Sequence, residues 1–184
     1  IRDSLEEADW VNANWTSGFT QMKPFPGEKA SKKTEVAMLF DQEAIYFGVK
    51  CYDHPDSVSR VLSLRDDFNP NLDFFGIFLD TYNDKQNGFF FGLSSRGVQV
   101  DAKIFSEDFN DLLNLVWRSK TQINDQGWFA EIKIPYSALR FPKSDIQTWN
   151  INFARQISRF REENTWSPVS PDLENYLLES GVVK

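Results

Sequence analysis

The stretch FFGIFLDTYNDKQNGFFFGL, residues 74–93, decides the fold. It holds two apolar runs, at residues 74–79 and 89–93, separated by a polar segment rich in turn-forming residues. Runs that are apolar at consecutive positions are typical of strands covered on both faces. Gly76 and Gly92 interrupt the runs and leave room for a bulky neighbour. The stretch therefore predicts a hairpin of two central strands.

Outside this hairpin, apolar and polar residues alternate with the two-residue period of half-buried strands. The alternating segments are residues 36–40, 45–51, 98–104 and 128–134. In each segment we expect the apolar set to face the core and the polar set to face solvent. Turn-forming clusters follow or separate these segments at residues 41–43, 94–97 and 124–127. This spacing predicts strands joined in sequence by hairpins.

The pattern as a whole predicts an all-β fold, an antiparallel β-sandwich of jelly-roll-like type. We expect one or two short helical turns, at residues 106–113 and 136–139. The 184 residues suit a single domain, and no repeat or linker divides residues 1–184. The chain begins at Ile1 without an initiator methionine, so we expect a piece of a longer protein. We also expect this piece to be a monomer.

Charge and composition exclude several functions. The net charge is −7, whereas nucleic-acid binding needs a basic surface, so we expect no nucleic-acid partner. His54 is the single histidine and Cys51 the single cysteine, which argues against His-based metal sites and against Ser-His or Cys-His catalysis. No glycine-rich phosphate loop is present. These features favour a protein that recognises a ligand without transforming it.

Carboxylates leave one catalytic alternative open. Asp101 and Glu131 each fall on the polar side of an alternating segment. Two carboxylates at a suitable separation could hydrolyse a glycoside. The competing interpretation is that both are solvated or ion-paired side chains, and it ranks above catalysis.

Acidic turns offer ligands for a structural calcium ion, which takes about six to eight oxygens. One candidate cluster pairs Asp53 with Asp56, and another combines Asp80, Asn83 and Asp84. A third charged group lies at residues 65–73. None has the spacing of an EF-hand loop, and ordinary turns capped by Asp or Asn are the alternative.

Aromatic side chains are the groups that a sugar-binding protein would use, because the apolar C–H face of a pyranose packs on a ring. Trp166 is the least strand-like of the six tryptophans and is the first candidate for such a platform; Phe68, in the loop at residues 66–70, is the second. Polar contacts to the ligand are predicted for Arg155, Arg159 and Asp101. Pairing with acids is the alternative for the arginines.

An ordered series of short motifs runs along nearly the whole chain. It comprises residues 33–36, 44–53, 65–67, 78–84, 97–101, 128–135, 139–141 and 149–155, with Trp10 near the start and Trp166 near the end. In this order the series resembles the family 9 carbohydrate-binding-like domain, in the version found at the N-terminus of large bacterial envelope proteins. The resemblance implies a β-sandwich, a glycan ligand, structural calcium, and a covalently linked β-barrel or other domain.

The same resemblance implies a location and a binding mode. The protein would be exported, to the periplasm or the cell surface, and associated with the outer membrane. Family members hold a sugar between two tryptophans; Trp166 matches one, and the loop before Asp73 offers Phe68 in place of the other. The chain would therefore be a non-catalytic carbohydrate-binding module. The alternative is an accessory or interaction domain of an outer-membrane protein without a sugar site.

Overall fold

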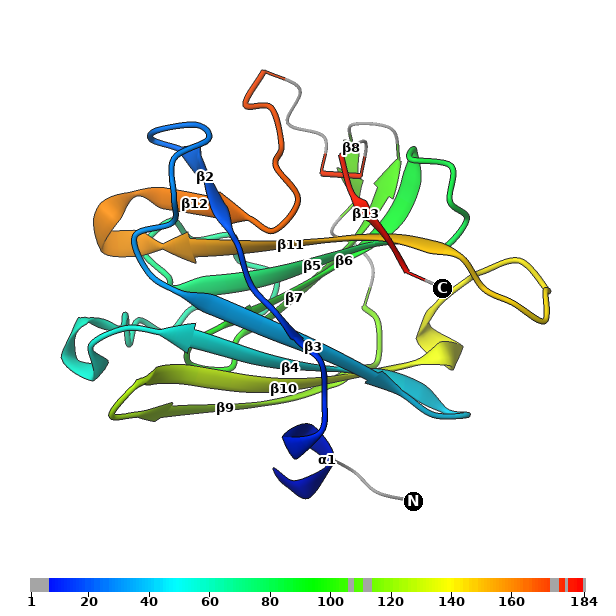
Figure 1. Ribbon diagram of the computed structural model, residues 1–184, viewed down its shortest axis with the longest axis horizontal. Helices are drawn as coiled ribbons and strands as arrows, with labels where there is room; N and C mark the ends of the chain where they lie inside the picture. Colours follow the sequence, from blue (N-terminus) through cyan, green and yellow to red (C-terminus); the bar gives the residue numbers. More distant parts are fainter. Residues whose placement is uncertain (1–6, 106–107, 111–113, 173–175, 178, 184) are drawn as a thin grey trace.

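The computed structural model describes residues 7–105, 108–110, 114–172, 176–177 and 179–183. Two antiparallel sheets pack face to face (Figure 1). The five-stranded sheet has the order β1-β3-β4-β10-β9, formed by Trp15–Thr16, Thr34–Phe40, Ala44–Tyr52, Gly127–Pro135 and Arg118–Asn124. This architecture confirms the predicted antiparallel β-sandwich.

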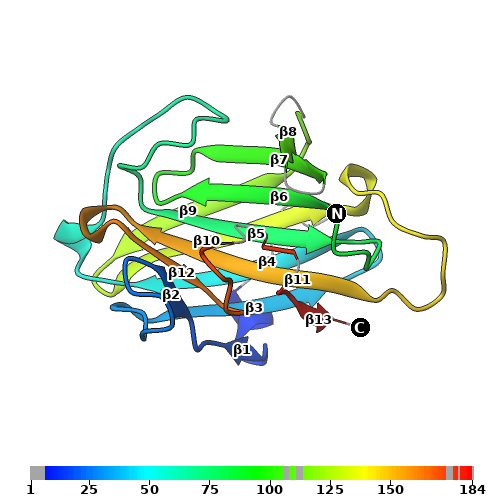
Figure 2. The same ribbon diagram turned by 90° about the horizontal axis from the view of Figure 1, so that it is seen from above.

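The larger sheet has the order β2-β12-β11-β5-β6-β7-β8, and β13 pairs with one end of β11 (Figure 2). Its strands are Thr20–Lys23, Glu162–Thr165, Trp149–Ile157, Phe74–Asp80, Asn87–Ser94, Gln99–Phe105, Asp108–Asn110 and, for β13, Gly181–Val183. Between β12 and β13, Tyr176 and Leu177 pack on the outer face of this sheet.

Helical structure is sparse. The helix α1, Glu7–Val11, lies on the outer side of the five-stranded sheet (Figure 1). Single 3-10 turns occur at Pro55–Ser57, Tyr136–Ala138 and Ser158–Phe160, and the second confirms the helical turn predicted at 136–139. In the segment 106–113, β8 occupies 108–110 and the other positions lie outside the described residues. Within the described part of the chain, no helix is long and apolar enough to cross a membrane.

The hairpin predicted from residues 74–93 forms the middle of the larger sheet. Strands β5 and β6 pair with Phe78 opposite Phe90 and Gly76 opposite Gly92. A Cβ on Gly76 would lie 2.6 Å from Cε2 of Phe90, so the glycine makes room for that ring. The alternation of the strand then places one set of its apolar residues between the sheets and the other set on the outer face.

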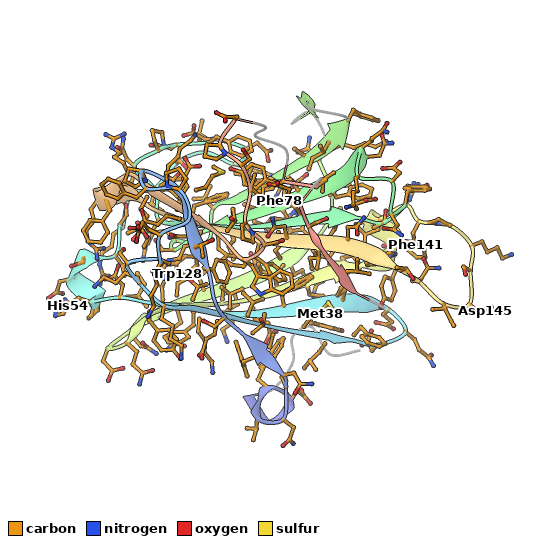
Figure 3. All side chains as sticks on the ribbon, turned by 45° about the horizontal axis from the view of Figure 1, so that its top comes forward. Met38, His54, Phe78, Trp128, Phe141 and Asp145 are labelled. Carbon is orange, nitrogen blue, oxygen red and sulfur yellow. The ribbon has the colours of Figure 1, made fainter. Side chains whose placement is uncertain are left out.

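Two apolar clusters result. The main core lies between the sheets and contains Phe47, Phe91 and Trp128, all 0% exposed. The second cluster covers the outer face of the larger sheet and contains Phe78, Phe90 and Leu177. Figure 3 turns the outer face of the larger sheet toward the viewer; Phe78 lies on this face, and Trp128 belongs to the core between the sheets. Each cluster removes large apolar surfaces from water, which stabilises the fold.

The orientation of β7 differs from the prediction. Its apolar residues Val100, Ala102 and Ile104 belong to the outer cluster, and the intervening Asp101 points between the sheets. The apolar set is nevertheless buried, because Phe78, Phe90 and the segment bearing Leu177 cover it. The alternation of buried apolar residues in β7 was predicted correctly, but the prediction that this apolar set faces the core between the sheets was wrong.

Candidate functional site

Trp166 packs into the structure at the end of the main core. Its ring meets Phe153 edge to face, with centroids 5.7 Å apart. Its indole Nε1 donates a hydrogen bond of 2.9 Å to Oγ1 of Thr16. A Cβ on Gly181 would lie 2.9 Å from Cη2 of the ring, so strand β13 also closes over it. Trp166 therefore ties β12, β1 and β13 together.

Phe68 lies on the opposite face of the larger sheet. It is 51% exposed and stacks on Phe90, with centroids 5.6 Å apart and an interplanar angle of 29°. Because Phe153 points into the main core and Phe90 belongs to the outer cluster, the sheet separates Trp166 from Phe68. The structure does not bring these two rings together as the two plates of one sugar site.

The two predicted arginines hold the fold. Arg155 is 2% exposed, and its guanidinium donates to the carbonyl oxygens of Lys33 and Tyr52 at 2.8 and 3.1 Å. Arg159 forms a bidentate ion pair with Asp53, at 2.6 and 2.7 Å. Both guanidinium groups therefore bind other parts of the protein, and neither is available to a ligand. This corrects the prediction of ligand contact for Arg155 and Arg159.

Asp101 is also committed to the interior. It is 0% exposed and accepts hydrogen bonds from Nε1 of Trp117 at 2.9 Å and from the amide of Leu115 at 2.8 Å. Its oxygen Oδ1 also accepts from the guanidinium of Arg65. Every partner is a donor of the protein, so this carboxylate has a structural role. The prediction of ligand contact is corrected accordingly.

The glycoside hydrolase alternative fails on the same geometry. Asp101 lies between the sheets on β7, whereas Glu131 lies on the outer face of β10 in the other sheet. Oε2 of Glu131 accepts a hydrogen bond of 3.0 Å from Nε1 of Trp10. The two carboxylates share no cleft and cannot flank one glycosidic bond.

The turn after β5 does not fit calcium. Oδ1 of Asp80 accepts from the amides of Tyr82 and Asp84 at 3.1 and 3.3 Å. Its Oδ2 accepts from the amide of Lys85 at 2.7 Å and from Nδ2 of Asn150 at 2.8 Å. A calcium ion would have to be coordinated by the lone pairs of these carboxylate oxygens, and here N–H donors already bind to them. Asp80 acts as the cap of a turn.

The remaining calcium candidates are likewise engaged or scattered. Oδ1 of Asn83 accepts from Asn150 at 2.7 Å, and Oδ1 of Asp84 accepts from two amides of its own turn at 2.8 Å. Asp53 faces cations, and the side chain of Asp56 is 87% exposed. Among the described residues, no group of three or more His, Cys, Asp or Glu is arranged to hold a metal ion.

Removal of divalent cations provides the check. Treatment with EDTA is expected to leave the Tm of the domain unchanged, because the candidate oxygens already have protein donors. Differential scanning fluorimetry with and without EDTA measures this. A lower Tm that added calcium chloride restores would contradict the assignment of these turns as metal-free caps.

A hollow of about 180 Å³ lies on the outer face of the larger sheet, beside Phe68. We call it the Phe68 hollow. Gly76 and Ala154 are small residues on β5 and β11 that line it. Aromatic side chains line it as well, namely Phe68, Phe74, Phe78, Phe90 and Tyr176.

These rings support one another. Phe74 and Phe78 lie 6.2 and 4.9 Å from Phe90, and Tyr176 stacks on Phe78 at 4.2 Å with an interplanar angle of 3°. Phe68 stacks on Phe90, and half of its own surface stays exposed. Mutual packing fixes the orientation of the exposed ring in advance, which lowers the entropic cost of binding a ligand.

Polar groups border the same hollow. Gln156 donates to the carbonyl oxygen of Leu72 at 2.8 Å, and Glu163 lies 3.9 Å from the ammonium group of Lys23. Thr165 pairs with Ala154 in the sheet and is 1% exposed, yet its Oγ1 has no hydrogen-bond partner among the described residues. A buried hydroxyl without a partner requires an explanation, and a ligand or a water molecule at this position is one.

Sequence reasoning identified Phe68 but missed the rest of this hollow. Phe74, Phe78 and Phe90 were assigned to covered strands without a ligand role. The available signal was the pair Gly76 and Gly92, which predicted room for bulky neighbours next to those rings. Tyr176 and Thr165 come from the C-terminal part of the chain, and no local pattern connects them with residues 68–90.

Comparison with known proteins supports the fold. No family model matches the chain, and no curated protein matches it. A family 9 carbohydrate-binding module from Caldicellulosiruptor kristjanssonii, solved in complex with cellotriose, is similar over 100% of this chain and 88% of that chain, with a TM-score of 0.69 and 16% identity. A family 9 module from that organism in complex with glucose covers 100% and 90%, with a TM-score of 0.69 and 17% identity.

A proposed carbohydrate-binding protein from Bacteroides uniformis ATCC 8492 gives a TM-score of 0.75 and 14% identity, over 95% of this chain and 87% of that chain. At such identities the similarity establishes a shared fold. The chain has the β-sandwich fold of family 9 carbohydrate-binding modules.

Proposed function

We propose that this domain is a non-catalytic carbohydrate-binding module and that the Phe68 hollow holds a sugar. The observation that carries the proposal is a packed cluster of rings that leaves Phe68 half exposed beside the unpartnered hydroxyl of Thr165. A pyranose has an apolar face for the ring and hydroxyls for Thr165, Gln156 and Glu163. Structures of the same fold in complex with cellotriose and glucose support the carbohydrate-binding part of this proposal.

The resemblance drawn from the sequence supports two further parts of the proposal, the location and the linked domain, and a monomeric state is proposed beside them. The domain would belong to an exported bacterial protein at the periplasm or cell surface, associated with the outer membrane. A β-barrel or another domain would be linked to it covalently, and the isolated domain would be a monomer. Cell fractionation with an antibody against the domain, and light scattering of the purified domain, test these points.

Truncation of the exposed ring is the direct test of the sugar site. In Phe68→Ala, affinity for a bound glycan is expected to fall about tenfold, because the stacking surface is removed. A glycan array identifies ligands, and calorimetry with those ligands and with cellotriose gives the Kd. Phe25→Ala is the matched control, since Phe25 is 64% exposed and lies outside the hollow.

Thr165→Val separates a ligand role from a structural one. Because Oγ1 has no partner among the described residues, the loss of the hydroxyl should not lower the free energy of unfolding. A weaker glycan affinity in this stable variant would therefore report a contact with the sugar. If the wild-type domain binds no glycan, the proposal is wrong.

The second candidate function is an interaction domain without a sugar site. Exposed apolar residues favour it: Phe40 and Ile146 are 72% and 73% exposed and line a groove of about 500 Å³ with Met38, Phe141 and Trp149. Exposed apolar patches often mark protein contacts. Absence of glycan binding would favour this candidate.

A further inference from the structure

A second hollow, of about 670 Å³, lies on the outer face of the five-stranded sheet, on the other side of the sandwich from the Phe68 hollow. We call it the Trp15 hollow. Its aromatic lining consists of Trp10, Trp15 and Phe129, and its polar lining includes Lys50, Lys120 and Gln122. Trp10 comes from α1 and Trp15 from β1, so the N-terminal segment supplies both tryptophans of the lining. Figure 1 shows α1 on the outer side of the five-stranded sheet.

The tryptophans are held in place by contacts that leave them partly exposed. Their centroids lie 6.0 Å apart, and both rings lie over Gly48, where a Cβ would come within 3.0 Å of each. Nε1 of Trp10 donates to Glu131 at 3.0 Å, and Nε1 of Trp15 donates to the carbonyl oxygen of Trp10 at 3.3 Å. Both rings are therefore preorganised over the sheet, in the manner that stacking of a sugar ring requires.

The charge of this face differs from that of the whole chain. Side chains that point outward from β4, β9 and β10 include four cations: Lys50, Arg118, Lys120 and Lys133. Outward-pointing acids on the same strands are Glu35 and Glu131, so the strands alone carry a charge of +2 in a chain of net charge −7, and α1 on the same side contains the acidic residues Glu7 and Asp9. The strand surface that carries Lys50 and Lys120 is therefore richer in cations than the chain as a whole, which favours an anionic group next to these two lysines.

The two acids on the strands of this face, Glu35 and Glu131, already have partners. Glu131 accepts from Trp10, and Glu35 lies 2.5 Å from the ammonium group of Lys33. The side chain of Lys120, which lies opposite Glu131 in the pairing of β9 with β10, has no hydrogen-bond or ion-pair partner among the residues that the structure describes. The ammonium group of Lys50 lies 3.8 Å from the centroid of the Trp15 ring, which places a positive charge directly at the aromatic surface.

We propose that the Trp15 hollow binds an acidic polysaccharide. A pyranose ring packs against Trp15 and Phe129, and the carboxylates or sulfates of the chain pair with Lys50 and Lys120. The shared chemistry is a sugar ring that carries an anionic group. This site is separate from the Phe68 hollow, so the inference does not depend on the function proposed for that hollow.

Calorimetry with trigalacturonate, a sulfated trisaccharide and a neutral trisaccharide tests the inference. The wild-type domain is expected to bind an anionic trisaccharide at least about tenfold more tightly than the neutral one. Binding of the carboxylated or of the sulfated probe identifies the anionic group. Equal affinity for all three, or binding to none, would overturn the inference.

Variants locate the site. Lys120→Gln is expected to weaken binding of the anionic trisaccharide about threefold, and Lys50→Gln with Lys120→Gln about tenfold, with a smaller loss at high salt. Lys143→Gln is the matched control, because Lys143 is exposed and does not line the hollow. Trp15→Ala is expected to abolish binding of the anionic trisaccharide. Circular dichroism shows whether this variant is folded. If it is unfolded, the affinities of the two lysine variants test the inference.

Two further outcomes separate the inference from its competitors. Phe68→Ala should leave binding of the anionic trisaccharide unchanged. If Phe68→Ala removes it and the lysine variants do not, the acidic sugar binds in the Phe68 hollow, so that the present inference fails while the proposed function stands. Equal affinity for a single-stranded oligonucleotide would show a general polyanion surface and would also overturn the inference.

Discussion

Asp53→Asn is expected to lower the free energy of unfolding by about 3 kcal/mol near neutral pH. The side chain of Asp53 is 1% exposed and pairs with Arg159, while Lys32 and Arg155 lie 3.6 and 4.0 Å away. The substitution removes the carboxylate that pairs with all three cations and leaves Lys32, Arg155 and Arg159 close together. Urea denaturation, followed by tryptophan fluorescence, measures the change.

The same substitution should change the response to acid. Burial by itself would raise the pKa of Asp53, but the Arg159 guanidinium and the amide of His54 hold that pKa below its ordinary value. A carboxyl with a lowered folded-state pKa stabilises the protein above its unfolded pKa of about 3.9, and the contribution is lost as the pH falls through the folded-state pKa. The difference between wild type and Asp53→Asn should therefore shrink below about pH 4.

Asp56→Asn is the control for Asp53→Asn. Its side chain is 87% exposed and its nearest charged partner is His54 at 3.9 Å. Exposed pairs of this kind contribute about 0–1 kcal/mol, so little change is expected. Equal losses in the two variants, or a loss in Asp53→Asn that persists unchanged in acid, would contradict the role given to the buried carboxylate.

Gly127→Ala is expected to cost about 3 kcal/mol or more and to give little folded protein. Gly127 ends the turn between β9 and β10 with a φ of 138°, a region that side chains rarely adopt. An added Cβ would press on the carbonyl oxygen of Cys51 and would lie 2.7 Å from the amide nitrogen of Asp53. Both contacts are with backbone, which cannot move without opening the pairing of β4 with β10.

Gly18→Ala isolates the conformational part of this effect. Gly18 also has a positive φ, 92°, but a Cβ there would have nothing within 4 Å. A loss of about 1 kcal/mol is expected from the backbone conformation alone. The difference in the free energy of unfolding between the two alanine variants measures the steric contact at Gly127. Similar values for the two would show that the close approach to Cys51 is relieved at little cost.

The sequence specified the strands well because hydrophobic alternation and turn residues are local properties. Residues 74–93 form the predicted hairpin, and the alternating segments before and after it form the other strands of the predicted sandwich. Alternation identifies residues that share a face, but it does not say which face is the core. In β7 the larger apolar surface lay outside, and the segment bearing Leu177 covered it. Such a long-range contact has no local signature.

The candidate site was harder to predict for the same reason. Trp166 follows a polar segment and therefore resembled a loop residue, but Phe153 and Thr16, both distant in sequence, bury it in part. Asp101 was expected to face solvent because it lies between apolar residues in an alternating strand. In the structure it is buried, and its hydrogen-bond donors Trp117 and Leu115 come from the segment that follows in the chain. Phe68 was identified because an aromatic residue in a polar loop is a local anomaly.

The two hollows open on opposite outer faces of a rigid sandwich, with the main core between them. With both proposals in place, one domain would be bivalent: it would hold a neutral chain on one side and an acidic chain on the other. Each domain would then act as a cross-link between two polymers, and the second attachment would gain from the high effective concentration created by the first. Turbidity or gelation of a mixture of the two polysaccharides would depend on the ratio of domain to polymer, with a maximum at intermediate ratios.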